Sequence, residues 1–127
     1  MRLLLDTHAL IWWLVDDPAL PRAARDAIAS PENDVYVSHV SAWEIAVKQQ
    51  LGKIEFPLQE FENILDANQF EPLPIRLDHI LTLGTLPLHH RDPFDRLLVA
   101  QSGNDNLILV SGDRHMTAYG VRVLWDS

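Results

Sequence analysis

The chain has 127 residues, 47% of them hydrophobic, contains no cysteine and carries a formal net charge of −8 at pH 7. This length and hydrophobicity suffice for the core of one compact domain, so we expect a single domain over residues 1–127. Only a short leucine run precedes Asp6, too short for the apolar core expected of a secretion signal, and no apolar run approaches the ~18 residues of a membrane span. We therefore expect a cytoplasmic protein that does not bind membranes; the lack of cysteine fits a reducing compartment.

Strand and helix patterns alternate along the chain without a linker, repeat or low-complexity segment. Such alternation predicts one α/β domain, and the strongly apolar runs among the strands predict buried parallel strands. In chain order we expect a strand at 2–5, a helix at 8–15 with Thr7 as a candidate cap, a short helix ending at Ala29, a strand at 35–37, a helix ending at Gly52, a helix around 61–65, a short strand at 73–75, a helical turn at 80–83, a helix opened by Asp92-Pro93, and strands at 107–110 and 121–125.

Four carboxylates fall where a strand ends or a helix is expected to begin. Asp6 and Asp113 follow the apolar runs of two strands, and Glu44 and Asp95 are expected to open amphipathic helices. The carboxyl ends of parallel strands are where an open α/β sheet presents side chains to a ligand. Converging carboxylates repel unless they are protonated or bridged by metal, and oxygen ligands without cysteine favour Mg²⁺ or Mn²⁺. The pattern indicates phosphodiester chemistry.

Each acidic position also has a purely structural interpretation. The segment Ser41-Ala42-Trp43-Glu44 matches a capping box, which the local pattern favours over a metal ligand. Asp92 before Pro93 is a strong helix cap, Asp95 could complement the helix dipole, and Asp113 could be a turn residue. Asp6 is harder to explain in this way, because a carboxylate directly after a buried strand is costly unless it is solvated, paired or bound to an ion.

The negative net charge argues against simple nucleic-acid binding, because phosphate backbones are normally met by basic side chains. Arginine outnumbers lysine eight to two, and Arg91, Arg96 and Arg114 lie near the acidic positions in sequence. A planar guanidinium suits phosphate or a carboxylate partner. These arginines are candidates for local phosphate contacts, and an ordinary acidic surface is the alternative.

Two aromatic pairs also need an interpretation. His89-His90 suggests a transition-metal site, but a third nitrogen or sulfur ligand at helical spacing is missing, which favours a surface position or a supporting contact to the acidic site. Trp12 and Trp13 are adjacent, so on one helix they cannot both face the same core. One of them is a candidate for an interface, with burial of both under neighbouring elements as the alternative.

Four segments carry a family resemblance: LLDTH at 4–8, SAWEIAVK at 41–48, HHRDPFDRLLVAQ at 89–101 and SGD at 111–113. Their order and spacing resemble those of PIN-domain ribonucleases, and specifically the VapC toxins of prokaryotic type II (VapBC) toxin-antitoxin systems. The resemblance covers essentially the whole chain, and the third segment is highly specific. Two departures stand out: Asp92 is an additional carboxylate near the third acidic position, and Ser-Gly-Asp replaces the Thr-x-Asp of many relatives.

The resemblance implies a single PIN-like domain with a central parallel sheet in an α/β/α sandwich. It implies that Asp6, Glu44, Asp95 and Asp113 bind magnesium or manganese, that the protein is a homodimer, and that a VapB-like antitoxin covers the site with its C-terminal segment. We therefore expect hydrolysis of RNA by a metal-activated water, with Asp6 and Asp95 as direct ligands. Glu44 and Asp113 would bind directly or through water.

Three further residues and four alternative functions complete the expectation. Ser111 is a candidate to orient the water or a carboxylate, and Arg96 or Arg114 to contact phosphate, with a structural ion pair as the other interpretation. A metal-dependent nuclease acting on DNA is an alternative, as is a catalytically silent module that only binds a partner. A phosphoacceptor receiver domain is disfavoured, because the only lysines are in the middle of the chain; a haloacid-dehalogenase-type phosphatase would need an aspartate at the position of His8.

Overall fold

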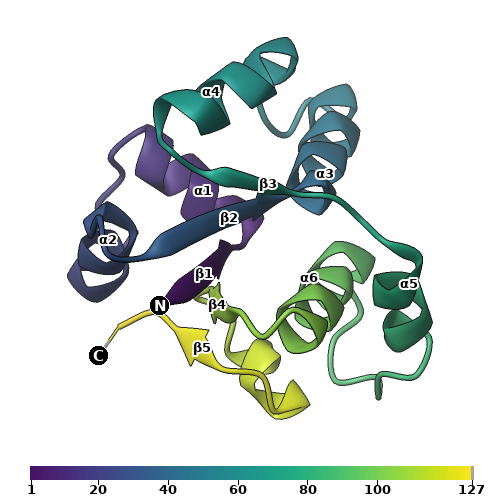
Figure 1. The fold of residues 1–127 in the computed structure, drawn as a ribbon. Coiled ribbons are helices and arrows are strands. Elements are labelled where there is room, and N and C mark those ends of the chain that lie inside the picture. The colour runs from purple at the N-terminus through teal and green to yellow at the C-terminus, as the bar shows by residue number, and fades with distance from the viewer. Residues whose placement is uncertain (127) are drawn as a thin grey trace.

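The computed structural model describes residues 1–126 and contains a five-stranded sheet in which all strands are parallel. Its order is β3-β2-β1-β4-β5 (Figure 1). The strands are β1 (Arg2–Leu5), β2 (Asp34–Ser38), β3 (Glu71–Leu73), β4 (Ile108–Val110) and β5 (Val123–Leu124). The parallel α/β fold expected from the sequence is confirmed.

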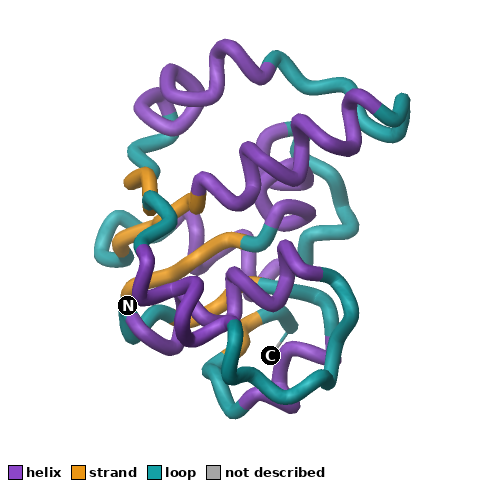
Figure 2. Tube along the Cα trace, turned by 90° about the vertical axis from the view of Figure 1, so that its right-hand side faces the viewer, coloured by secondary structure: helices purple, strands orange, loops and turns teal. Residues whose placement is uncertain are grey.

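Helices cover both faces of this sheet, as Figure 2 shows with the strands in orange and helices above and below them. α1, α2 and α4 pack on one face, α5 and α6 on the other, and α3 contacts both α1 and α6 (Figure 1). The helices are α1 (Thr7–Leu14), α2 (Arg22–Ala29), α3 (His39–Gln50), α4 (Phe61–Ala67), α5 (Leu77–Leu83) and α6 (Pro93–Asn104), with two 3-10 helices, η1 (Leu58–Glu60) and η2 (Arg114–Tyr119).

The leucines of β1 show why the sheet is covered on both faces. Leu3, Leu4 and Leu5 are all fully buried, although successive side chains of a strand point to opposite faces. Leu3 and Leu5 pack with side chains of α1, α2 and α4, whereas Leu4 packs with α6 and with Met116 of η2. A continuous apolar strand therefore occupies the centre of the sheet, as parallel sheets require.

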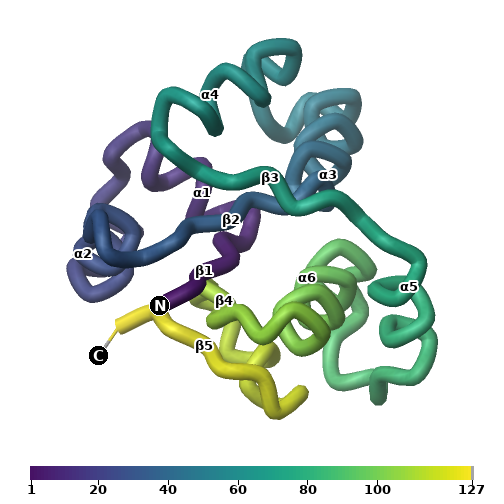
Figure 3. The backbone as a smooth tube through the Cα atoms, in the orientation of Figure 1, coloured from purple at the N-terminus to yellow at the C-terminus, as the bar shows by residue number. Residues whose placement is uncertain are grey.

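The connections reverse direction at β1. The chain passes from β1 through α1 and α2 to β2 on one side, and it returns through α6 to β4 on the other side (Figure 3). Leu5 pairs with Val37 of β2 and with Val110 of β4, so the carboxyl ends of these three strands are aligned. Such a switch point between β1 and β4 is where open α/β sheets bind ligands.

Two predictions about helix starts were wrong. Asp6, not Thr7, caps α1, because its Oδ1 accepts a hydrogen bond from the Ala9 backbone N–H at 2.8 Å. α3 begins at His39 directly after β2 and is capped by Ser38, whose Oγ accepts from Val40 N–H at 2.9 Å. Glu44 consequently lies inside α3 and does not open it, and the predicted capping box does not form.

The sequence predicted the edge strand and the short 3-10 helices least well. The strand expected at 73–75 lies at Glu71–Leu73, where Glu71 and Pro72 are exposed because β3 is an edge strand, which tolerates proline. Neither η1 nor η2 was predicted, since a single 3-10 turn has no apolar periodicity.

None of the helices in residues 1–126 has both the length and the apolar character needed to cross a membrane.

The cap of α6 generates a stability prediction. As expected, Asp92 is the N-cap: its Oδ1 accepts from Phe94 N–H at 2.8 Å and from Asp95 N–H at 3.3 Å, and Pro93 takes the first helical position. Asp92→Ala should be less stable than Asp92→Asn by roughly 1 kcal/mol, because both lose the charge but only asparagine retains a capping oxygen. Urea denaturation of the two variants measures this, and equal stability would contradict the cap.

Candidate active site

Three of the four predicted acids share one hollow at the switch point between β1 and β4. The hollow has a volume of about 280 Å³. Its lining consists of three carboxylates, an aromatic group and two small residues: Asp6, Asp95, Asp113, His8, Trp12, Trp125, Ala19 and Gly112. Residues separated by more than a hundred positions in sequence therefore meet at one edge of the sheet.

Asp6 is held by the end of β1. Its backbone N–H donates to Val110 O of β4 at 3.0 Å, and its side chain is buried while it caps α1. Burial raises the pKa of Asp6 above the ordinary 3.8, although hydrogen bonds from Ala9 and Ser111 oppose the increase. A carboxylate in this position favours either a proton or a bound cation.

Glu44 lies beside the hollow on α3 and is buried. Its Oε1 accepts a hydrogen bond from Thr7 Oγ1 at 2.6 Å, and its Oε2 accepts from Lys48 Nζ at 2.7 Å. Its negative charge raises the pKa of both Asp6 and Asp95. Glu44 is thus electrostatically part of the acidic cluster, although it is not among the residues that line the hollow.

Asp95 lies in the first turn of α6, and the pKa of its carboxyl group is strongly raised. Burial is the main cause that raises its pKa to about 7, and the charges of Asp92, Glu44 and Asp6 raise it further. His90 acts in the opposite direction. At neutral pH this group is therefore close to half protonated in the absence of a cation.

Asp113 is the best stabilised acid of the site. Burial alone would raise the pKa of Asp113, but hydrogen bonds from the backbone and ring of His115 and from His90 outweigh it and lower the pKa. The contacts are His115 N–H to Oδ1 at 2.9 Å, His115 Nδ1 to Oδ1 at 2.9 Å and His90 Nε2 to Oδ2 at 2.6 Å. Asp113 also caps η2. It is therefore fixed as an ionised carboxylate.

His90 links the third and fourth acids. Its Nδ1 accepts from Asp92 N–H at 3.0 Å, so in the neutral ring the proton is on Nε2, which lies 2.6 Å from Asp113 Oδ2 and 3.3 Å from Asp95 Oδ2. Metal-binding histidines instead donate their second ring N–H to an acceptor. The ring therefore supports the two acids as a donor, which agrees with the predicted supporting role and argues against zinc.

Within residues 1–126, two further groups of side chains have the spacing of metal ligands. One shares Asp113 with the predicted set and adds His90 and His115, but the tautomer of His90 makes its Nε2 a donor. The other joins Asp78, His79 and Asp105. Arg76 already occupies the second cluster, with hydrogen bonds to Asp78 at 2.8 and 3.1 Å and to Asp105 at 2.5 and 3.1 Å. That cluster connects α5 to the end of α6.

The three further candidates, Ser111, Arg96 and Arg114, differ in whether they contact the acidic residues. Ser111 belongs to the site, because its hydroxyl hydrogen-bonds Asp6 and accepts from Asp113 N–H at 3.1 Å. Arg96 turns to the loop before α6, where its Nη2 donates to Leu86 O at 2.9 Å. Arg114 is exposed beside Asp113. A phosphate contact by Arg114 stays a prediction, whereas the contacts of Arg96 indicate a structural role.

Sequence reasoning did not assign Thr7 or Lys48 to the site. Thr7 directly follows Asp6 and hydrogen-bonds Glu44. Lys48 is the cation nearest the acids, and its hydrogen bond to Glu44 is the main cause that raises its pKa. The spacing of Glu44 and Lys48, four residues apart on one helix, was the signal that could have identified the pair.

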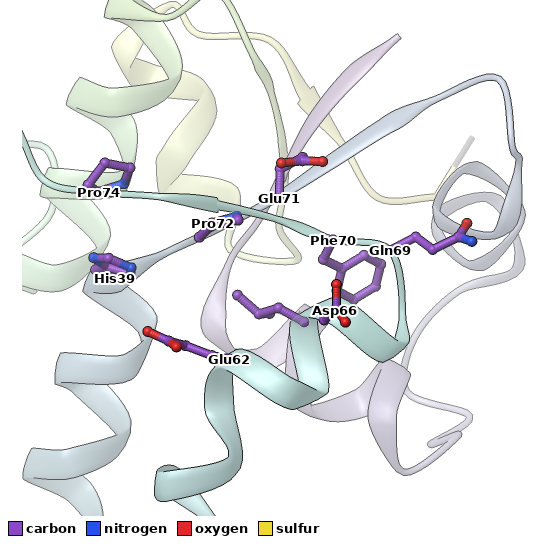
Figure 4. A pocket seen from close by; sticks show the side chains of 9 residues that line it. His39, Glu62, Asp66, Gln69, Phe70, Glu71, Pro72 and Pro74 are labelled. Carbon is purple, nitrogen blue, oxygen red and sulfur yellow. The ribbon is translucent and has the colours of Figure 1, made fainter.

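A larger hollow of about 680 Å³ lies elsewhere, between α4, β3 and the start of α3 (Figure 4). His39, Glu62, Asp66 and Glu71 are among its lining residues. None of the four predicted acids lines it. Volume alone therefore does not identify the site, because the convergent carboxylates lie in a smaller hollow.

Comparisons with known proteins agree with this architecture. The sequence matches the PIN domain family over residues 3–121. No curated protein sequence matches it. Similar solved structures include VapBC2 from Rickettsia felis bound to a promoter DNA fragment (TM-score 0.72, 14% identity, 99% of this chain and 100% of that chain). DNA-bound VapBC from Salmonella typhimurium is also similar (TM-score 0.70, 14% identity, 98% of this chain and 97% of that chain). So is FitAcB from Neisseria gonorrhoeae (TM-score 0.66, 17% identity, 96% of this chain and 96% of that chain). At identities this low, the structural similarity shows a shared fold and nothing more.

The pKa of Asp95 predicts how stability depends on pH in metal-free protein. Between about pH 4 and pH 7 the folded chain retains a proton that the unfolded chain has lost, so the free energy of unfolding should fall as pH rises through this window. Asp95→Asn should remove that loss. The variant should match wild type near pH 4 and exceed its stability by on the order of 2 kcal/mol at pH 8.

Urea denaturation with a chelator present, repeated at several pH values, measures the difference. Asp26→Asn is the matched control, because it removes an exposed carboxylate on α2. If the stability of Asp95→Asn parallels that of wild type from pH 4 to pH 8, the raised pKa of Asp95 is contradicted.

Proposed function

Because the chain belongs to the PIN domain family, we propose that it is a metal-dependent endoribonuclease and the toxin of a VapBC-type toxin-antitoxin pair. The observation that carries the proposal is the convergence of Asp6, Asp95 and Asp113 in one hollow, with Glu44 beside it. The four acids are those that the family resemblance assigns to metal binding.

The residues of the hollow fit a hard divalent cation. Every candidate ligand is a carboxylate, and burial together with mutual repulsion raises the pKa of Asp6 and Asp95. Lys48 provides a single positive charge and is engaged with Glu44. Additional positive charge would relieve the repulsion, and all-oxygen ligands favour Mg²⁺ or Mn²⁺. Asp6 and Asp95 would hold the ion directly, and Glu44 and Asp113 directly or through water.

Bound in this position, Mg²⁺ or Mn²⁺ would supply a water activated for attack on the phosphodiester and positive charge for the leaving oxygen. The chain's own residues hold the ligands in place. Ser111 and Ala9 orient Asp6, Thr7 and Lys48 orient Glu44, and the contacts of His90 keep Asp113 near Asp95. Since carboxylates ligate in their ionised form, metal affinity should increase with pH around the pKa of Asp95.

We further propose a VapB-like antitoxin and a second copy of the chain as partners. Support for the antitoxin comes from similar structures that are VapBC complexes, among them VapBC-1 from nontypeable Haemophilus influenzae. The tryptophan pair offers no support for the dimer, because Trp12 lines the acidic hollow and Trp13 packs on Phe70 and donates to Asn68 at 3.1 Å. The homodimer rests on the resemblance.

The metal and catalytic roles can be tested with three isosteric variants. Asp6→Asn and Asp95→Asn should lose nearly all RNA cleavage and also the increase in melting temperature that Mg²⁺ or Mn²⁺ produces in wild type, because each loses a ligand charge. Asp92→Asn is the matched control: it removes the neighbouring carboxylate but still caps α6, so it should retain both properties. Cleavage of an RNA panel and thermal melting with and without metal provide the measurements.

If Asp92→Asn is inactive and Asp95→Asn active, their roles are reversed. Activity that survives chelation, with melting unchanged by metal, contradicts the metal site. If the protein cleaves DNA and not RNA, its substrate is DNA. If it cleaves neither, a catalytically silent binding module is favoured.

The toxin role predicts an effect on cells. Induced expression of wild type in bacteria should arrest growth, whereas Asp6→Asn should not, because arrest requires the acidic site. Colony counts after induction measure this, with protein levels compared by immunoblot. Equal growth of the two strains at equal protein levels, without any antitoxin, would contradict the toxin role.

A further inference from the structure

We propose that the aromatic wall of the acidic hollow, formed by Trp12 and Trp125, stacks on an unpaired nucleobase next to the scissile phosphate. The proposal rests on the proposed ribonuclease function and assigns a base-binding role to these two tryptophans.

The aromatic wall is part of the same hollow as the acids. Trp12 of α1 and Trp125, which follows β5, line the hollow together with Asp6, Asp95 and Asp113. The ring centroids of Trp12 and Trp125 are 5.8 Å apart, with 48° between the ring planes. Both rings are partly exposed. A nucleotide whose phosphate lies at the carboxylates therefore has aromatic surface within the same hollow.

The absence of a side chain at Gly112 leaves room for the indole of Trp125 beside the acids. A Cβ at position 112 would lie 2.7 Å from Cε2, 2.9 Å from Cζ2 and 3.0 Å from Nε1 of Trp125, so no other residue type fits here without moving the indole. The next residue is Asp113. The Ser-Gly-Asp segment, a departure from the pattern of many relatives, thus matches the placement of this tryptophan, and both belong to the acidic hollow.

The negative net charge of the chain favours a way to bind RNA that does not depend on positive side chains. Proteins usually bind RNA through Lys and Arg contacts to phosphate, but this chain has a net charge of −8. Lys48 pairs with Glu44, and Arg96 donates to Leu86 O. Stacking of a base on an aromatic ring contributes binding free energy without positive charge and tolerates any base. The aromatic wall therefore offers a source of RNA-binding free energy that does not depend on positive charge.

The indole N–H groups distinguish this wall from ordinary core packing. Trp13 Nε1 donates to Asn68 Oδ1 at 3.1 Å. Within residues 1–126, neither Trp12 nor Trp125 donates its indole N–H to an acceptor on the protein. Each can donate to an oxygen of a base or of the backbone.

The size of the hollow matches one unpaired base. Its volume of about 280 Å³ is close to the ~300 Å³ at which small-molecule sites begin. A base in a helix is stacked on its neighbours and cannot reach such a site without being extruded. Unpaired bases in loops and single strands are free to stack on side chains.

A coupling experiment between ring and base tests the proposal. Binding of short labelled single-stranded RNAs, each with one abasic nucleotide at a successive position, is measured by fluorescence anisotropy in the cleavage-deficient Asp95→Asn background with a chelator present. One position should weaken binding about 5- to 100-fold when its base is removed, the range expected for one stacked base. Trp125→Leu should weaken binding of intact RNA to a similar extent and abolish the penalty at that position. Trp125→Phe, which retains a ring, should preserve most of the penalty.

Several outcomes would overturn the proposal. Additive effects of base removal and Trp125→Leu mean that ring and base do not interact, and equal binding of duplex and single-stranded RNA excludes an unpaired base. Circular dichroism checks folding; if Trp125→Leu is unfolded, Trp12→Leu and Gly112→Ala, which displaces the indole, test the same coupling. Weakened binding of a protein partner with unchanged RNA binding would make the wall a protein docking surface.

Failure of the proposed function appears separately, in cleavage of intact RNA by wild type with metal. Cleavage without ring-base coupling overturns the base site and leaves the nuclease function standing. Coupling without cleavage supports the base site and overturns the nuclease function.

Discussion

Electrostatic repulsion among four carboxylates is the constraint on which the rest of the site depends. The sheet order places the ends of β1 and β4 side by side, and with them Asp6 and Asp113. α6 and α3 add Asp95 and Glu44. Topology therefore collects negative charge in a partly buried hollow, where burial is the main cause and repulsion the second cause that raise the pKa of Asp95 to about 7. A fold that concentrates like charges in this way gains by binding a cation.

The four acids differ in how neighbouring groups stabilise their negative charge. Glu44 and Asp113 receive hydrogen bonds from neighbouring side chains, with Lys48 serving Glu44 and His90 serving Asp113. Asp6 and Asp95 keep the increased pKa. The two acids whose pKa stays raised despite their hydrogen bonds and neighbours are thus those expected to ligate metal directly. The same hollow has an aromatic wall, so one cavity combines chemistry for the phosphate with a surface for the base.

The sequence predicted what depends on local pattern. Apolar runs located the ends of β1 and β4, hence Asp6 and Asp113, and the Asp92-Pro93 pair identified the cap of α6. Glu44 shows the limit: its spacing from Ser41 satisfied a capping box, but Ser38 at the end of β2 starts the helix earlier. The roles of His90 and Trp125 depend on contacts between segments distant in sequence, which no local pattern encodes. The four acids as a metal-binding set rest on the family resemblance.

The central claim is that the hollow bounded by Asp6 and Asp95 is a divalent-metal site. Anomalous X-ray diffraction from crystals grown with Mn²⁺ tests it most directly, because it locates the ion without relying on activity. We expect an anomalous peak within ligand distance of the carboxylates of Asp6 and Asp95. A peak found only at the Asp78–His79–Asp105 cluster or at the rings of His90 and His115, or no peak at millimolar Mn²⁺, would contradict it.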